Sequence, residues 1–190
     1  MATLANSSTT IPTTQTLLDA LRARLAALTW NGEPAFASIN LYDLRDIATA
    51  LRELVVSQDR ICLVVYEGET FSTQRQGRNL HIKQTVKVTL FMSDQNLGDR
   101  QAAFYGANGT PGVVALKDLI VGLAPLSNGT VQPAVLGLLL PNSVVTPVGS
   151  EPFVLSDSTR EELAGRGAWA TQLEITSGML SVDTGQMPIV

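Results

Sequence analysis

Two side chains that could perform catalysis each occur once in the sequence, as His81 and Cys62. Cys62 lies in the apolar run at 60–66, which favours an inert buried thiol, whereas a cysteine nucleophile needs an exposed, electropositive setting and a base. His81 falls on the polar face of an alternating segment, and no Asp-Ser or Cys partner is indicated near it. One cysteine and one histidine also exclude an intrachain disulfide and a metal cluster built from these residues.

Three further motifs resemble known sites without completing them. Segment 106–112 precedes a predicted helix, but a phosphate-binding Walker loop needs a lysine directly after its last glycine, and the next lysine is Lys117. Segment 94–99 resembles part of a calcium loop, yet the twelfth position, which requires a bidentate acid, falls on Tyr105. The paired glutamates 161–162 follow a capped helical start and are expected on a solvated face. We predict no catalytic, metal or cofactor site.

The composition favours a folded domain that does not grip nucleic acid. Of the 190 residues, 45% are hydrophobic and 16% charged, which suffices for a core. The formal net charge is −4 and aromatic residues make up 5%, so neither a basic phosphate-binding face nor a stacking platform is expected.

The remaining candidate residues are polar or basic groups that could bind a partner protein. Segment 67–79 is predicted to be an exposed loop, and its guanidinium groups could contact an acidic partner, although a solvated loop tip is equally compatible. Further cations are predicted on the outward face of the next strand. The candidate interface residues are Arg75, Gln76, Arg78, Lys83 and Lys87.

Three helices are predicted from apolar residues at helical spacing. The first covers Thr14–Leu28, and the second covers Leu44–Val56 with Asp43 as its N-cap. The third begins at Thr110-Pro111 and stops at Pro125. The expected stripes are Leu17, Leu21, Leu25 and Leu28; Ile47, Leu51, Leu54 and Val55; and Leu116, Leu119, Ile120 and Leu123.

Extended segments are predicted between and after the helices. Residues 60–66 are apolar on both alternations, which indicates a strand covered on both faces. Residues 80–92 alternate, with Gln84 as the one polar residue on the inward face. Residues 169–176 alternate as well, and if they pair with 80–92, Glu174 would lie opposite Lys83 or Lys87. Shorter extended segments are expected at 35–41, 131–140 and 144–148, where prolines favour sheet edges.

One domain is expected over residues 14–177. Residues 1–13 carry neither the basic region nor the apolar core of a signal peptide and are expected to form an arm, and residues 178–190 are expected to form a tail. The longest apolar stretch, 134–140, is too short to span a bilayer. The elements predict an α/β (α+β) fold, with an antiparallel or mixed sheet of about four to five strands packed by two to three helices.

The order of these elements resembles that of phage tail terminator proteins, in particular the phage Mu-like family of myophages and prophages. The most similar parts are the VVYEG ending of the strand at 60–66, the alternating strand HIKQTVKVTLFMS, the helix sequence ALKDLIVGL and the closing strand WATQLEIT. The resemblance covers about residues 14–177, and the segment 132–152 departs from the family pattern.

The resemblance implies structural work in a virion without enzymatic activity. Tail terminators assemble as a hexameric ring on the head-proximal end of the tail tube, where they stop its growth and present a surface for head joining. The implied partners are other copies of the chain, the tail tube protein and the head-completion or neck proteins, with the sheath as a further candidate. Two predicted loops, 67–79 and the Gly/Asn-rich segment 93–112, are expected to contact the tube or neighbouring copies. Genomic DNA would pass through without specific binding, and no membrane is involved.

Two alternatives remain open. A head–tail connector or another neck protein would have similar sequence properties, and its position in the particle would distinguish it. A small-molecule-binding α/β domain or enzyme would need a pocket with convergent polar groups. Substitution of His81, Asp94, Glu161 and Glu162 would then abolish an activity and leave assembly intact.

Overall fold

The computed structural model describes residues 12–43, 45, 49–50, 52, 60–76, 79–95, 100–107, 111–121, 135–152 and 166–183. The helices are α1 (Thr14–Ala26), α3 (Arg100–Tyr105) and α4 (Gly112–Val121). The strands are β1 (Thr29–Trp30), β2 (Glu33–Pro34), β3 (Ser38–Asp43), β4 (Ile61–Gln76), β5 (Asn79–Gln95), β6 (Gly137–Leu140), β7 (Ser143–Pro152) and β8 (Arg166–Asp183).

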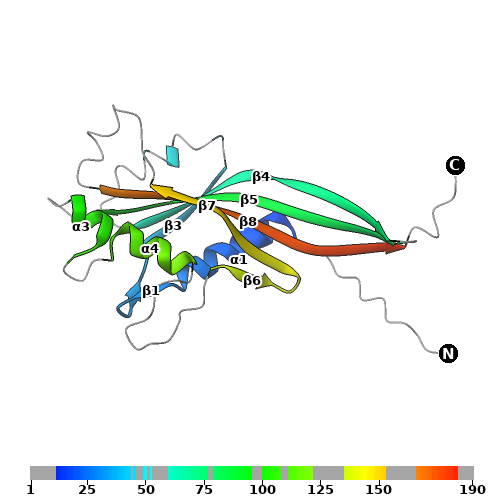
Figure 1. Cartoon of the computed structure of the whole chain (residues 1–190), viewed down its shortest axis with the longest axis horizontal. Coiled ribbons are helices and arrows are strands. Elements are labelled where there is room, and N and C mark those ends of the chain that lie inside the picture. Colours follow the sequence, from blue (N-terminus) through cyan, green and yellow to red (C-terminus); the bar gives the residue numbers. More distant parts are fainter. Residues whose placement is uncertain are drawn as a thin grey trace.

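A curled, six-stranded mixed sheet organises the molecule, in the order β3-β4-β5-β8-β7-β6 (Figure 1). β3 pairs with β4 in parallel, and the other neighbours are antiparallel. The α+β fold class is confirmed, but the expected four to five strands are too few. β6 and β7, which come from the proline-containing segments, also join this sheet, whereas β1 and β2 form a separate short hairpin.

The predicted loop at Glu67–Asn79 is wrong, because most of it is strand. β4 continues to Gln76 and pairs with β5 in an unbroken antiparallel ladder from Gly68↔Lys87 to Gln76↔Asn79. Thr, Phe and Ser fit a pleated strand well, and the backbone bonds to β5 hold this polar segment extended. β8 likewise runs to Asp183, six residues beyond the predicted end of the domain at residue 177.

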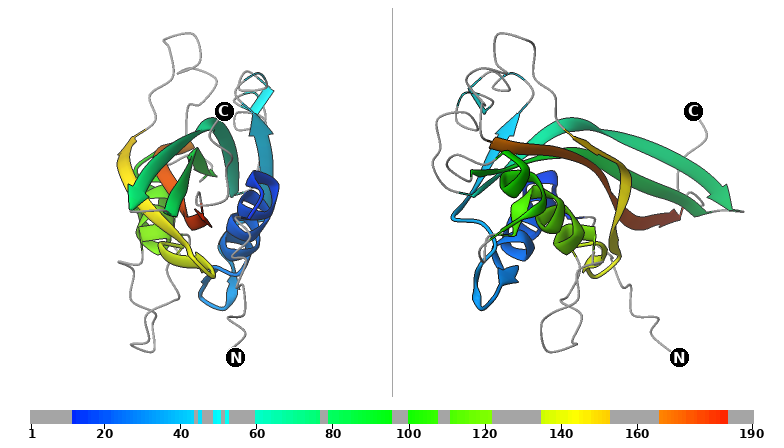
Figure 2. Two further views of the ribbon diagram at one scale, coloured as in Figure 1. Left: turned by 90° about the vertical axis from the view of Figure 1, so that its right-hand side faces the viewer. Right: turned by 60° about the vertical axis from the view of Figure 1, so that its left-hand side comes forward.

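The main core lies between the sheet and two helices, α1 and α4, which occupy the same side of it (Figure 2). The predicted α1 stripe is confirmed, since Leu17, Leu21 and Leu25 are fully buried. Thr13 caps α1, because its side-chain oxygen accepts a hydrogen bond from the backbone N–H of Thr16 at 3.2 Å. From α4 the core receives the predicted Leu116, Leu119 and Ile120, whereas Leu123 lies outside the described residues.

A second, smaller cluster covers the other face of the sheet near the start of β4. Its buried residues are Ala50, Ile61, Leu63, Val65, Phe91 and Ala168. The prediction that 60–66 is covered on both faces is therefore confirmed. Thr89 lies on the face of β5 that was predicted to point outward, but it is buried there, and its hydroxyl donates to Glu67 Oε1. Of the second predicted helix, only 49–50 and 52 are described as helical, and Asp43 Oδ1 accepts from the Arg45 N–H at 2.8 Å.

A short helix, α3, replaces part of the loop predicted at 93–112. It packs directly against the start of α4, where Gly112 has φ +69° and a Cβ would lie 2.3 Å from the Gly106 nitrogen. Only glycine allows this approach. The buried Asp94 stabilises the same junction, since its Oδ2 accepts the Gly112 N–H at 3.0 Å.

Candidate assembly surfaces

Three strands extend beyond the helices as a projecting finger (Figure 1), formed by residues 68–76 of β4, 79–85 of β5 and 178–183 of β8. It begins where the outer strands of the sheet stop. The last residue of β3 pairs with Tyr66, and the first residue of β7 pairs with Ser177. Beyond these two points β4, β5 and β8 pair only with each other in the described part of the chain.

The root of the finger contains irregularities on both of its ladders. One lies between Tyr66 and Gly68 in β4, where Gly68 has φ +128°. The other lies in β8, where two residues, Gly178 and Met179, stand between the pairs Ser177↔Gln84 and Leu180↔Ile82 opposite the single residue Lys83. An extra residue in a strand bends it and increases its twist, and a positive φ is accessible to glycine without strain. These irregularities set the direction in which the finger leaves the body.

A polar network around the buried Gln84 joins the finger root to α1, and its acceptor Glu69 is exposed to solvent. Gln84 is 4% exposed, and its Nε2 donates to Glu69 Oε2 at 2.7 Å and to Thr14 Oγ1 at 3.1 Å. Thr14 Oγ1 in turn donates to Glu69 Oε2 at 2.5 Å. The three residues join the first turn of α1 to β4 and β5, which explains the polar exception that the sequence shows at Gln84. Nearby, burial and the Glu69 carboxylate raise the pKa of Tyr66.

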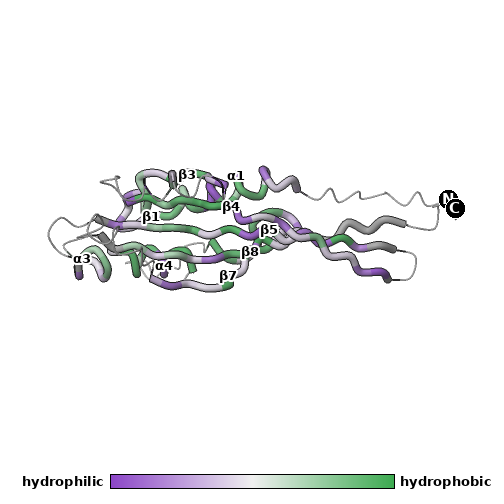
Figure 3. The backbone as a smooth tube through the Cα atoms, turned by 90° about the horizontal axis from the view of Figure 1, so that it is seen from above, coloured by the Kyte–Doolittle hydropathy of each residue, from purple (hydrophilic) through white to green (hydrophobic). Residues whose placement is uncertain are grey.

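The β4 surface of the finger is largely polar between residues 69 and 75, with one aromatic residue. Phe71 is 60% exposed, and every residue from Thr70 to Arg75 is exposed. Along β4, the residue hydropathy falls from the apolar segment in the body to the finger (Figure 3). Phe71 was not among the predicted interface residues, and a single apolar residue in a polar segment gives no signal in the sequence by itself.

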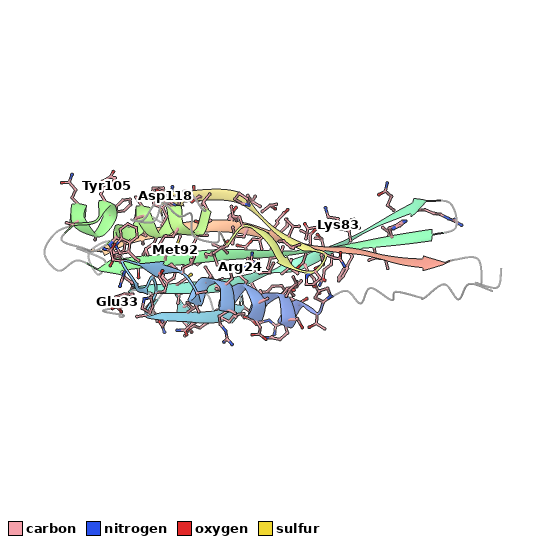
Figure 4. The ribbon with its side chains drawn as sticks, turned by 90° about the horizontal axis from the view of Figure 1, so that it is seen from below. Arg24, Glu33, Lys83, Met92, Tyr105 and Asp118 are labelled. Atoms are coloured by element: carbon pink, nitrogen blue, oxygen red, sulfur yellow. The ribbon has the colours of Figure 1, made fainter. Side chains whose placement is uncertain are left out.

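The candidate interface residues occupy two levels of the finger. Arg75 lies near the tip, paired with Leu80, and the backbone of Gln76 pairs with Asn79, while Arg78 lies outside the described residues. Lys83 is exposed opposite Ser72 on the polar face (Figure 4). These positions belong to a hairpin of two paired strands, which holds them in place more firmly than the predicted loop would.

Lys87 lies at the root and faces the residue that the sequence predicted. It pairs with Glu174 in the β5–β8 register, and the distance from Nζ to Oε1 is 3.9 Å. The alternative partner, Lys83, lies farther along the finger. The expected pairing of 80–92 with 169–176 is thus confirmed, and Lys87 is engaged within its own chain.

A second exposed apolar surface lies across the sheet, at the β6–β7 edge formed by Leu138, Val144 and Val148. Leu138 is 64% and Val148 58% exposed, and Leu138 pairs with Val144. The guanidinium of Arg24 donates to the backbone oxygens of Val135 and Leu138, which fixes β6 against α1. The strand order places this edge on the opposite side of the sheet from the outer edge of β4.

A third surface lies at the end of the molecule opposite the finger, where α3 presents Tyr105 (Figure 4). Tyr105 is exposed and packs beside Phe104, with ring centroids 5.8 Å apart. Phe104 lies 6.0 Å from Trp169, and Lys117 Nζ is 5.8 Å from the centre of the Trp169 ring. The exposed Tyr105 ring is therefore held by a packed group formed by Phe104, Trp169 and Lys117.

The residues singled out for chemistry do not converge in the described part of the chain. Burial raises the pKa of the Cys62 thiol, which is fully enclosed in the core. His81 pairs with Gln74 and Ser181 on the finger, and Asp94 is engaged by Gly112. Among the described residues no three His, Cys, Asp or Glu side chains gather where they could hold a metal ion. The glutamates 161–162 lie outside the described residues.

Neither protein-family models nor curated protein sequences match this chain. In the part of the chain that the structure describes, no helix is both long and apolar enough to cross a membrane.

Proposed function

We propose that this chain is a phage tail terminator, which forms a ring at the head-proximal end of a tail tube, stops tube polymerisation and provides the head-joining surface. The observation that carries the proposal is the placement of exposed apolar side chains on opposite sides of one sheet. Phe71 projects from β4, while Leu138, Val144 and Val148 project from the β6–β7 edge. Two different surfaces on one protomer suit head-to-tail contacts, which close into a ring when the rotation per copy allows it.

The charge balance supports a role as a conduit. The net charge is −4, and counterion release from a strongly basic lumen would bind the DNA that must pass through. A lightly charged acidic chain avoids this retention. Assembly contacts would then involve the finger and the α3 segment, which replace the two loops expected to meet the tube or neighbouring copies.

The first experiment tests ring formation by the purified full chain, using mass photometry and negative-stain electron microscopy. We expect rings of about six copies. Phe71→Ser and Leu138→Ser should each reduce the ring fraction, whereas Arg22→Ser, on the exposed side of α1, should leave it unchanged. A strictly monomeric chain, even with tail tubes present, would contradict the proposal.

The second experiment tests the place of the ring in the particle. Antibody labelling of assembly intermediates should find the chain on finished tails that have not joined a head. A chain that instead remains on tail-less heads would be a head–tail connector. Loss of the chain should give tails of uncontrolled length if it terminates the tube.

A further inference from the structure

The finger exposes two unpaired backbone edges. β4 has β5 on one side from Gly68 to Gln76, and no described strand lies on its other side. β8 pairs with β5 from Leu180 to Asp183, and β7 does not accompany it there. At Gly178 the β6–β7 turn still lies against β8, because a Cβ on this glycine would be 2.5 Å from the Cβ of Asn142. A strand edge presents a row of N–H and C=O groups that can pair with another strand.

The β4 edge lacks the protection found elsewhere in the same sheet. Proteins usually blunt exposed edges with short strands, prolines, bulges or lysines. The β6–β7 side has such devices, because β6 is four residues long and β7 contains Pro147, Pro152 and a register shift after Pro147. Residues 69–76 contain neither proline nor lysine and form a regular ladder with β5. The β4 edge is therefore suited to pairing.

The directions of the strands determine what can pair with what. β4 and β8 are both antiparallel to β5, so they run parallel to each other. If the β4 edge of one copy meets the β8 edge of the next, the strands pair in parallel and both copies point the same way. Rotation about one axis then repeats the contact, and closure removes every open finger edge.

We propose that the outer edge of β4 (68–76) in one copy pairs with the outer edge of β8 (180–183) in the next copy, so that the fingers join into one continuous sheet around the ring. This inference rests on the proposed function, because it specifies how the ring closes. The two edges lie on opposite sides of the same finger and at the same position along its length. Across the three strands, one row of paired residues is Arg75, Leu80 and Val182, and the next row is Gln76, Asn79 and Asp183.

Cross-linking can distinguish this contact from the alternatives. Gln74 and Ser181 share a level through His81, and they lie on opposite edges of the finger. The double variant Gln74→Cys/Ser181→Cys, treated with a short bismaleimide, should give a ladder of oligomers up to the ring size on a denaturing gel. Each single variant should remain monomeric on the gel, because a head-to-tail contact never brings two identical positions together. Cys62 is fully buried and should not react in the native chain.

Two outcomes would overturn the proposal. Dimers from the single Gln74→Cys variant would indicate a two-fold contact between β4 edges. If rings form but no cross-link appears in either the double variant or the register-shifted variant Ser72→Cys/Ser181→Cys, the ring contact lies elsewhere and the proposed function still stands. Conversely, cross-linked rings that never bind tail tubes would refute the proposed function and keep the finger contact.

A proline pair provides an independent test. In an antiparallel ladder, neighbouring residues direct their N–H groups to opposite sides, so of Thr73 and Gln74 one bonds β5 and the other points outward. Of Thr73→Pro and Gln74→Pro, one should therefore keep the native circular dichroism spectrum and melting temperature within a few degrees, yet lose ring formation. If the well-folded variant still forms wild-type amounts of rings, the β4 edge is not part of the contact.

Discussion

Gln84 and Glu69 join β5 to β4 through a hydrogen bond of 2.7 Å, at the level where β3 has already left the sheet. Thr14 binds both side chains, so the same small network also holds α1 against the root of the finger. Most of the exposed finger lies beyond this point. The orientation of the finger therefore depends on a few polar contacts in addition to the backbone ladders.

Removing the Gln84 amide should destabilise the fold. Gln84→Ala removes the donor to Glu69 and Thr14, and because Glu69 is exposed, water can replace that donor, so the free energy of unfolding is expected to fall by about 0.5–1.5 kcal/mol. Urea denaturation measures this loss. Gln74→Ala, on the exposed part of the finger, is the matched control and should change stability by less than about 0.5 kcal/mol. Equal effects for the two variants would show that the network does not stabilise the root.

Asp94 should matter through the α3–α4 junction. Its Oδ2 accepts the backbone N–H of Gly112, the first residue of α4. Asp94→Ala leaves that buried donor without this acceptor and should cost about 1–3 kcal/mol. Asp94→Asn retains a side-chain oxygen and should cost less. Thermal denaturation of both variants tests this order, and a more damaging Asn variant would contradict the assignment.

The Lys87–Glu174 pair should contribute little to stability. Both side chains are partly exposed, at 50% and 34%, and solvent screens their attraction. A double-mutant cycle with Lys87→Ala and Glu174→Ala should give a coupling energy below about 1 kcal/mol that decreases further in high salt. A larger coupling, insensitive to salt, would mean that the pair is shielded from water.

Cys62 should make stability fall at alkaline pH. Burial raises its pKa in the folded state, while the thiol of the unfolded chain ionises above about pH 8.5. Above that pH the unfolded state binds fewer protons than the folded state, so the free energy of unfolding decreases, by at most about 1.4 kcal/mol per pH unit. Denaturation between pH 7.5 and about 9.5, below the range where tyrosines ionise, should show this slope in the native chain and lose it in Cys62→Val.

Charge reversal at the finger tip tests the predicted interface residues directly. Arg75 is exposed, so Arg75→Glu should change the unfolding free energy by less than about 0.5 kcal/mol. Together with Arg78→Glu it should nevertheless reduce ring formation or tail joining. Lys83→Glu on the polar face is a useful comparison. If rings and joined particles form at wild-type levels, the tip arginines are not part of the assembly contact.

The parts of the fold that the sequence predicts well are those with local apolar periodicity. Alternation identified 80–92 and 169–176 as strands, and their pairing, if it occurred, was expected to place Glu174 opposite Lys83 or Lys87; the structure shows that they pair and that the partner is Lys87. The leucine stripe of α1 identified its buried side. These patterns record which face of an element meets the core, so they are visible in a short window of sequence.

The β4 part of the finger was not predicted as a strand, because its local sequence lacks the apolar alternation of a strand that packs on a core. Residues 67–76 are mostly polar and contain Gly68, which in isolation is typical of a loop. The strand exists because β5 pairs with it along its whole length, and such pairing is not visible in one segment alone. The polar network at the finger root could not be predicted for the same reason. Gln84 stood out as a polar residue in the sequence, but its partner Thr14 lies 70 residues away.

The continuity of β4, β5 and β8 has a mechanical consequence. The strands that form the floor of the core run without interruption into the finger, and their ladders contain hydrogen bonds along the full length. A pull along the finger axis would therefore load many of these bonds at once in shear, whereas a sideways pull would open them one after another from the tip. A protein attached through its finger would resist axial tension far better than bending.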